Sequence, residues 1–283
     1  MGLSVAALCP VRPATCQLNE SEKPMQSSCA EIQAQLTDRV LEITINRPER
    51  KNALTMAMYA AMAELLNSAA DSGEVRVVII TGAEGVFTSG NDLMDFLGGS
   101  ASSEESPVFQ FMLALYSFPK PVVAAINGPA VGIGTTMLLH CDMAFAGDDA
   151  MFKMPFVDLG LCPEYGSSFF MPRIMGHARA SELLLLSKKF DAAEAVALGL
   201  CNAALPANEV LNQARMTAAE LATKAPEAVR LTKRLLRAGT REAGAQVIQE
   251  EALHFQKRLG SEEFKEAGTA FMEKRPADFS RFE

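Results

Sequence analysis

The sequence predicts an α/β fold, in which helices cover the faces of a parallel sheet. Up to Pro163, segments rich in β-branched and apolar residues alternate with segments of helical pattern, which is typical of strand–helix–strand units. After Pro163 the pattern is helical almost throughout. The chain has 283 residues, 49% of them hydrophobic and 21% charged, so it can bury a substantial core. One main domain with appended segments is the simplest organisation for such a chain.

The first strand–helix–strand unit begins with a predicted strand at residues 41–45, where β-branched residues alternate with others. Pro48 follows that strand and ends it, because proline disfavours continued regular structure around it. Thr55 is placed to cap a helix over residues 56–68. Residues 75–81 are apolar except for one arginine, as in a strand that is buried on both faces of a sheet. The unit therefore predicts a parallel crossover.

A second unit repeats this order further along the chain. The pattern predicts a helix at residues 107–117, a strand at 122–127, a short helix at 134–140 and another strand at 141–146. A repeated unit of this kind supports the α/β prediction, since parallel strands need helical crossovers between them.

The chain is expected to fall into three parts. Residues 1–28 have no sustained periodicity and predict a flexible extension, residues 29–205 form the α/β core, and residues 206–283 form a helical C-terminal region. That region carries apolar residues at helical spacing, among them Leu253 and Phe271. Ordinary core packing explains them, and a subunit interface is the sharper alternative, because exposed apolar faces mark association.

Composition narrows the classes of function. The net charge of −8 and the pI of about 5.1 argue against a protein that binds nucleic acid through its phosphates. The six cysteines form no CxxC pair and the three histidines are scattered, so neither a metal site nor a disulfide scaffold is predicted. The longest apolar runs fall well short of the roughly 18 residues that a membrane helix needs.

The ends of the sequence suggest no particular compartment. The apolar patch near the N-terminus has no basic segment ahead of it, which argues against a secretory signal. The C-terminal Arg-Phe-Glu is not a peroxisomal address of the SKL type. Cytoplasm is therefore the default expectation, and a peroxisomal or mitochondrial location stays open for a eukaryotic source.

Two glycine loops follow predicted strands, and we expect their backbone N–H groups, rather than their side chains, to be the functional groups. The first, FTSGND, spans residues 87–92, and Gly90 permits a backbone angle that other residues avoid. The second, NGPAVGIGTT, spans residues 127–136 and leads into a helix, whose N-terminus favours negative charge. Two N–H donors that converge on one oxygen form an oxyanion hole. For either loop taken alone, a tight connection is the simpler explanation.

A dinucleotide site is a weaker interpretation of the second loop. Gly132 and Gly134 stand between a strand and a helix as in a GxGxxG fingerprint, but Met137 occupies the third glycine position. A serine hydrolase is set aside because the sequence contains no GxSxG elbow.

Glu164 is the candidate base. It stands between a proline and a glycine in MPFVDLGLCPEYGSS, residues 154–168, and mostly apolar residues precede it. Desolvation in such a setting raises the pKa of a carboxyl group and suits it to proton transfer near neutral pH. A surface glutamate at the start of a helix is the plainer alternative. Together with the two loops, Glu164 suggests an enzyme that uses one base on an acyl thioester.

Several segments together resemble the crotonase superfamily, the enoyl-CoA hydratase/isomerase group, over residues from about 31 to 275. The matching segments are INRPERKNAL, VVIITGAEGVFTSGNDL, KPVVAAINGPAVGIG, CDMAFAGDDAMFKMPFVDLGLCPE and LSKKFDAAEAVALGL. The resemblance implies a spiral of repeated ββα units with a helical C-terminal trimerisation region. It also implies homotrimers or dimers of trimers, and acyl-CoA thioester substrates with coenzyme A as part of the substrate and no separate cofactor.

The same resemblance implies the roles of individual residues. It gives the oxyanion donors as the N–H groups of Asn91 and Ile133, and the base as Glu164. The residues implied to lie at the coenzyme A nucleotide are Arg50, Lys51, Ala53 and Leu54. Those implied to line the thioester and pantetheine channel are Ser89, Gly90, Asp92 and Leu93. Further substrate contacts are implied at Gly132, Gly134 and Phe156.

Departures from the hydratase pattern favour one branch of the group. Hydratases carry glutamates where this chain has Thr136 and Phe156, and neither of these can serve as an acid or base for water. Glu164 instead resembles the glutamate of monofunctional Δ3,Δ2-enoyl-CoA isomerases of fatty acid β-oxidation. The alternatives are another crotonase-type enzyme, namely a hydratase, a dienoyl isomerase or a thioesterase, and a non-catalytic scaffold that binds acyl-CoA.

Overall fold

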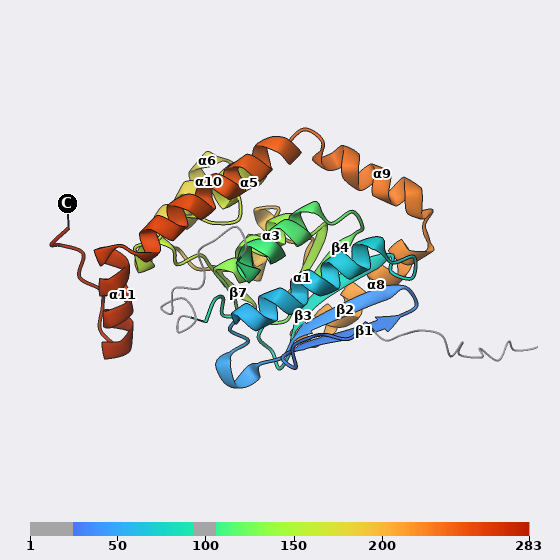
Figure 1. The fold of residues 1–283 in the computed structure, drawn as a ribbon, viewed down its shortest axis with the longest axis horizontal. Coiled ribbons are helices and arrows are strands. Elements are labelled where there is room, and N and C mark those ends of the chain that lie inside the picture. The colour runs from blue at the N-terminus through green and yellow to red at the C-terminus, as the bar shows by residue number, and fades with distance from the viewer. Residues whose placement is uncertain (1–24, 93–105, 283) are drawn as a thin grey trace, which may run out of the picture.

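The computed structural model describes residues 25–92 and 106–282, and it has the predicted mixed α/β architecture (Figure 1). Of the predicted N-terminal extension, residues 1–24 lie outside the described part, as does Leu93 of the predicted substrate channel. No helix in the described ranges is both long and apolar enough to cross a lipid bilayer.

A six-stranded sheet forms the centre of the fold. The first two strands in its order pair antiparallel and every later pair is parallel. Its strands, in spatial order, are β1 (Ile32–Thr37), β2 (Val40–Ile45), β3 (Val77–Gly82), β4 (Val122–Ile126), β6 (Met143–Gly147) and β9 (Ala203–Leu205). The sequence predicted the four middle strands within a few residues and missed the two edges.

Helices cover both faces of this sheet, as Figure 1 shows. On one face, Val78 and Ile80 of β3 join the main core beneath α1 (Met56–Asp71) and α3 (Pro107–Ser117). On the other face, the alternate residues of β3 pack against the small buried side chains of α8 (Val210–Thr223). Burial on both faces explains why β3 is apolar without alternation.

A second, three-stranded sheet stands beside the first and carries part of the second glycine loop. Its strands are β5 (Ala130–Val131), β7 (Met151–Lys153) and β8 (Phe190–Asp191). The helix predicted at 134–140 is in fact a single α-helical turn, α4 (Ile133–Thr136), followed by the 3-10 helix η2 (Met137–His140). After Pro163 the chain is mostly helical, as predicted, and the short strands β8 and β9 interrupt the helices.

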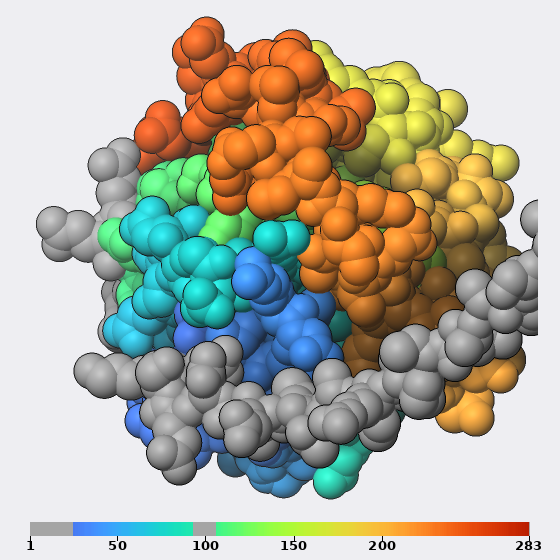
Figure 2. Space-filling view, turned by 90° about the vertical axis from the view of Figure 1, so that its right-hand side faces the viewer, coloured from blue at the N-terminus to red at the C-terminus, as the bar shows by residue number. Residues whose placement is uncertain are grey.

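The remaining helical segments lie around the strands and at the C-terminal end of the chain. Short ones precede or connect the strands: η1 (Pro48–Arg50), η3 (Val157–Leu159), α5 (Ser167–Met175), α6 (His177–Leu185), α7 (Ala192–Ala197) and η4 (Ala207–Glu209). The last three helices form an arch over the body in Figure 1: α9 (Pro226–Arg237), α10 (Arg241–Leu259) and α11 (Glu262–Glu273). In Figure 2 the orange C-terminal helices lie beside the blue and cyan N-terminal segments.

Candidate active site

The two glycine loops lie side by side because backbone hydrogen bonds join them. The N–H of Val131 donates to the carbonyl of Thr88 at 2.9 Å, and the N–H of Thr88 donates to the carbonyl of Pro129 at 3.1 Å. These bonds form a parallel bridge between Thr88 and Ala130. Segments far apart in the sequence are thereby fixed in one register.

Two glycines let the loops approach each other. Gly90 has φ of +88°, and a Cβ on it would lie 2.8 Å from the carbonyl oxygen of Val131. Gly132 has φ of +56° and donates its N–H to the carbonyl of Lys153 at 2.8 Å. Side chains rarely tolerate such backbone angles, so both positions favour glycine for conformational reasons.

The predicted oxyanion donors have unoccupied N–H groups. Within the described residues, the N–H groups of Asn91 and Ile133 have no hydrogen-bond partner. Ile133 is the first residue of α4, where helix geometry leaves N–H groups unpaired. Asn91 pairs with Leu54 in a backbone bridge, and its side-chain Oδ1 accepts a short hydrogen bond from the hydroxyl of Tyr59. The structure thus presents one donor from each loop.

A cavity of about 650 Å³, which we call the main cavity, opens beside both loops. Its lining comes from η1, the two loops, the segment around η3, and the facing sides of α10 and α11. The residues that line the main cavity include Arg50, Lys51, Ala53, Ser89, Gly90, Asn91, Asp92, Gly132, Ile133, Lys153, Phe156, Asp158, Leu161, Glu164, Phe255, Leu259, Phe264, Ala267, Gly268, Phe271 and Met272.

Glu164 is the chemically distinctive side chain of the main cavity. It is 4% exposed, and its Oε1 has no hydrogen-bond partner within the described part of the chain. Burial, and secondarily the charge of Glu251, raises the pKa of Glu164 from 4.5 to about 8. A buried carboxyl group with this pKa is suited to take up and return a proton near neutral pH.

The other carboxylates of the main cavity are paired with cations. Asp92 accepts from Arg47 at 2.7 Å, and Asp158 accepts from Lys153 at 2.7 Å. Among the described lining residues, Glu164 is therefore the carboxylate without a cation partner, which distinguishes it as the candidate base.

The turn that carries Glu164 is held from several sides. Tyr165 and Gly166 both have left-handed backbone angles, with φ of 58° and 73°. The hydroxyl of Tyr165 donates to the carbonyl of Met112 at 2.9 Å, and the carbonyl of Tyr165 lies 2.8 Å from Nε2 of His140. Desolvation lowers the pKa of His140 to about 3, so its neutral ring donates this hydrogen bond. These contacts orient Glu164 while leaving its carboxyl group free.

Most of the predicted site residues come together, and two do not reach the cavity surface. Leu54 is completely buried in the core and supports Asn91 through the backbone only. Gly134 is buried behind the loop, where a Cβ would lie 2.6 Å from the methyl group of Thr88. Neither residue lines the main cavity, because the first turn of α4 and the bridge to Asn91 turn them toward the core.

Sequence reasoning missed several neighbours of the site. Tyr59 gave no signal, since a buried tyrosine in an amphipathic helix has the same pattern as any core aromatic. Phe271, which the helical spacing predicts as a core or interface residue, lines the main cavity from α11 together with Phe264. Conversely, the apolar residues of α3, such as Phe111, belong to the packing between helices and the sheet. Phe156, which the resemblance gives as a substrate contact, lines the cavity.

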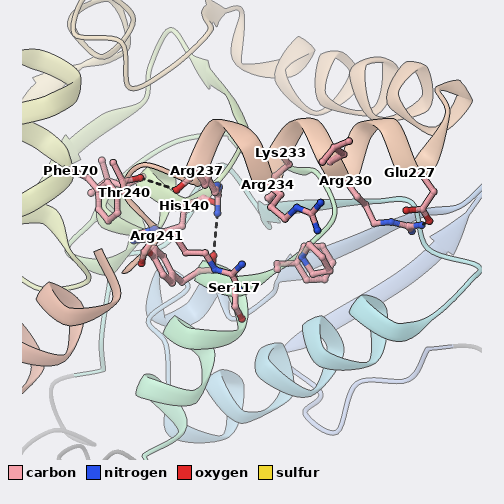
Figure 3. A pocket seen from close by; sticks show the side chains of 15 residues that line it. Ser117, His140, Phe170, Glu227, Arg230, Lys233, Arg234, Arg237, Thr240 and Arg241 are labelled. Carbon is pink, nitrogen blue, oxygen red and sulfur yellow. Dashed lines mark hydrogen bonds and ion pairs between the residues drawn. The ribbon is translucent and has the colours of Figure 1, made fainter. Parts of the chain in front are cut away.

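A second cavity, of about 430 Å³, lies beneath α9 and is rich in cations rather than carboxylates (Figure 3). Lys233 donates to Asp142 at 2.7 Å and to a backbone carbonyl, and Arg237 donates to the carbonyl of His140. Glu227, its lining carboxylate, is mostly exposed and pairs with Arg230. These contacts anchor α9 to the core, and the unpaired buried carboxyl group lies in the main cavity instead.

The described side chains offer no grouping for a metal. No cluster of three or more His, Cys, Asp or Glu residues within residues 25–92 and 106–282 is arranged to hold an ion.

The chain is similar to known proteins of one family. Residues 35–281 match the family described as enoyl-CoA hydratase/isomerase. The chain is 37% identical over 243 residues to enoyl-CoA delta isomerase 2 of Rattus norvegicus, which covers 84% of this chain and 62% of that protein. It therefore spans about three fifths of the length of this relative.

Other relatives carry different names. A probable enoyl-CoA hydratase of Rhodobacter capsulatus is 36% identical over 260 residues, covering 88% of this chain and 97% of that protein. Among solved structures, Pseudomonas aeruginosa OdaA is 51% identical with a TM-score of 0.85, covering 86% of this chain and 99% of the other.

Proposed function

Because the chain belongs to the enoyl-CoA hydratase/isomerase family, we propose that it is the isomerase type of enzyme, which converts a 3-enoyl-CoA to the trans-2-enoyl-CoA in fatty acid β-oxidation. The observation that carries the proposal is that Glu164, beside two free backbone donors in the main cavity, is the unpaired carboxyl group among the described lining residues. One base and an oxyanion hole are sufficient for moving a double bond.

In the proposed mechanism, the thioester oxygen accepts hydrogen bonds from the N–H groups of Asn91 and Ile133. Glu164 removes a proton from C2, and the resulting dienolate places its negative charge on the thioester oxygen. The protonated Glu164 then returns the proton to C4. Each oxyanion donor is worth about 2.7 to 4 kcal/mol of transition-state stabilisation, and general-base catalysis contributes about a hundred- to ten-thousandfold.

Hydration is disfavoured by the same geometry. Addition of water requires one group to activate the water and another to protonate the substrate carbon. Thr136 is completely buried and does not line the main cavity, and Phe156 does line it but cannot transfer a proton. The relatives named hydratases make hydration the competing function, and it has to be measured beside isomerisation.

The decisive assay measures isomerisation of 3-hexenoyl-CoA by the purified protein. Hydration of 2-hexenoyl-CoA is measured in parallel. We expect isomerisation without hydration. Glu164→Gln should lower kcat by about a hundredfold or more, because the amide cannot accept the C2 proton. Binding of a saturated acyl-CoA, measured by calorimetry, should be nearly unchanged. Full isomerase activity in the variant, or hydration by the wild type, would contradict the proposal.

A further inference from the structure

We infer that Glu251, a residue of α10 that does not line the main cavity, is a positioning residue that holds the turn carrying Glu164. The inference rests on the proposed function, in which Glu164 is the base. It connects the helical C-terminal region to the chemistry of the core.

Glu251 acts as the N-terminal cap of α5. Its Oε2 accepts a short hydrogen bond from the N–H of Gly166, and its Oε1 accepts from the N–H of Ser168 at 2.9 Å and from the Ser168 hydroxyl. The first N–H groups of a helix have no partners within the helix. Gly166, at the N-cap position of α5, has no side chain to satisfy them. A carboxylate 83 residues further along the chain does so instead.

The capped turn is the one that orients Glu164. The N–H and the hydroxyl of Ser167 both donate to the carbonyl of Glu164, at 3.1 and 2.7 Å. Glu251 therefore holds the residues on either side of Ser167, and Ser167 holds the backbone of the base. Glu251 is only 7% exposed, so solvent does not compete strongly for these bonds.

Glu251 also places a negative charge next to Glu164. Burial raises the pKa of Glu251 as well, but hydrogen bonds from Ser168 and Gly166 to its carboxylate oppose that rise, whereas Glu164 Oε1 has no partner among the described residues. Of the coupled pair, Glu251 thus ionises first and opposes ionisation of Glu164.

Other groups near the pair do not change charge around neutral pH. Burial raises the pKa of Cys162 to about 11 and lowers that of His140 to about 3. It also raises the pKa values of Tyr59 and Tyr165 well above their usual range. The nearby cation, Arg258, is engaged with the carbonyl of Gly160 and with Glu263. A shift in the titration of Glu164 can therefore be assigned to Glu251.

Two variants separate positioning from mere stabilisation of the fold. Glu251→Gln removes the charge and most of the cap, so the acid limb of kcat/KM should move to lower pH by about half a unit or more, and kcat should fall. Ser168→Ala removes one hydrogen bond but keeps the charge, so kcat should fall about fivefold at unchanged KM while the acid limb stays in place. Glu250→Gln, an exposed neighbour on α10, should match the wild type in both respects.

A titration that does not depend on turnover separates this inference from the proposed function. In protein labelled with ¹³C at glutamate carboxyl carbons, the Glu164 signal is the one lost in Glu164→Gln. Its midpoint should fall in Glu251→Gln and stay constant in Ser168→Ala. An unchanged midpoint in Glu251→Gln, or wild-type kcat in Ser168→Ala, would overturn the inference. A shifted midpoint in a protein without isomerase activity would refute the proposed function alone.

Discussion

The unpaired carboxyl group of Glu164 has a measurable consequence for stability. Its pKa is about 8 in the folded protein against 4.5 for the free side chain, so the folded state binds more protons between these values. The stabilising contribution is fully present below about pH 4.5 and is lost as the pH rises through about 8. Stability should therefore decrease over this interval on account of Glu164.

Glu164→Gln tests this effect, because the amide does not titrate. Between pH 5 and pH 8, the free energy of unfolding should change less in the variant than in the wild type, by on the order of a few kcal/mol. Urea titrations at several pH values would measure it. Glu220→Gln, which alters a mostly exposed carboxylate, serves as the control. Parallel pH profiles for wild type and Glu164→Gln would show that Glu164 titrates normally in the folded protein.

We predict that Tyr59 helps to orient the backbone of the first loop. Its buried hydroxyl donates to Oδ1 of Asn91, whose N–H is a proposed oxyanion donor. Tyr59→Phe should lower kcat about fivefold with little change in KM, since a net hydrogen bond of about 1 kcal/mol that fixes the donor is lost. Steady-state kinetics with a 3-enoyl-CoA measure this.

Tyr116→Phe is the matched control for that experiment. Tyr116 donates its hydroxyl to the carbonyl of Arg241 at 2.6 Å and lines the second cavity rather than the main one. Its loss should leave kcat unchanged. Equal losses of kcat in both variants would point to general destabilisation instead of a role in orienting the loop.

At the scale of elements, the close contact between the two loops can be tested at one glycine. In Gly90→Ala the new Cβ would lie 2.8 Å from the carbonyl oxygen of Val131 at a backbone φ of +88°. The strain of such a conformation is about 1 to 3 kcal/mol. We expect the loops to separate, kcat to fall at least tenfold, and thermal stability to decrease.

Gly73→Ala is the control, because nothing lies within 4 Å of the added Cβ and φ is not positive there. Differential scanning calorimetry and the isomerase assay compare the two variants. If Gly90→Ala retained full activity, precise contact between the loops would not be needed for catalysis.

The elements that the sequence predicted are those with strong local patterns. The continuous apolar run of β3 and the threonine cap of α1 are local signals, and the structure confirms both. The edge strand β1 was missed although Ile32, Ala34 and Leu36 alternate with polar residues. Strands β5 and β8 have two residues each, which is too short for any period to appear.

The parts of the candidate site that depend on local sequence could be predicted. Gly90, Gly132 and the Pro-Glu-Tyr-Gly turn around Glu164 are local features, so a sequence reveals them. The capping of that turn by Glu251 depends on the path of the chain over 83 intervening residues. The lining of the main cavity by Phe264 and Phe271 likewise depends on how α10 and α11 pack against the core. Contacts of this long-range kind leave no local pattern.

At the scale of the whole molecule, several large apolar side chains of the C-terminal helices are exposed on the surface. Large side chains on these helices are 45 to 80% exposed: Leu231, Leu235, Leu236 and Leu253, and also Phe271 and Met272, which line the main cavity as well. Clusters of this kind on helices mark association sites. We propose, as the family resemblance implies, that α9–α11 join subunits into a homotrimer or a dimer of trimers.

Light scattering after size-exclusion chromatography tests that proposal. The wild type should elute with a mass about three or six times the chain mass of 30.4 kDa. A double variant, Leu235→Glu with Leu236→Glu, should shift the mass toward the monomer, because two charges would be desolvated at the interface. Leu186→Glu changes a side chain that is 70% exposed outside the C-terminal helices, and should leave the mass unchanged. A monomeric wild type would overturn the proposal, because Leu235 and Leu236 would then stay exposed on the surface of α9.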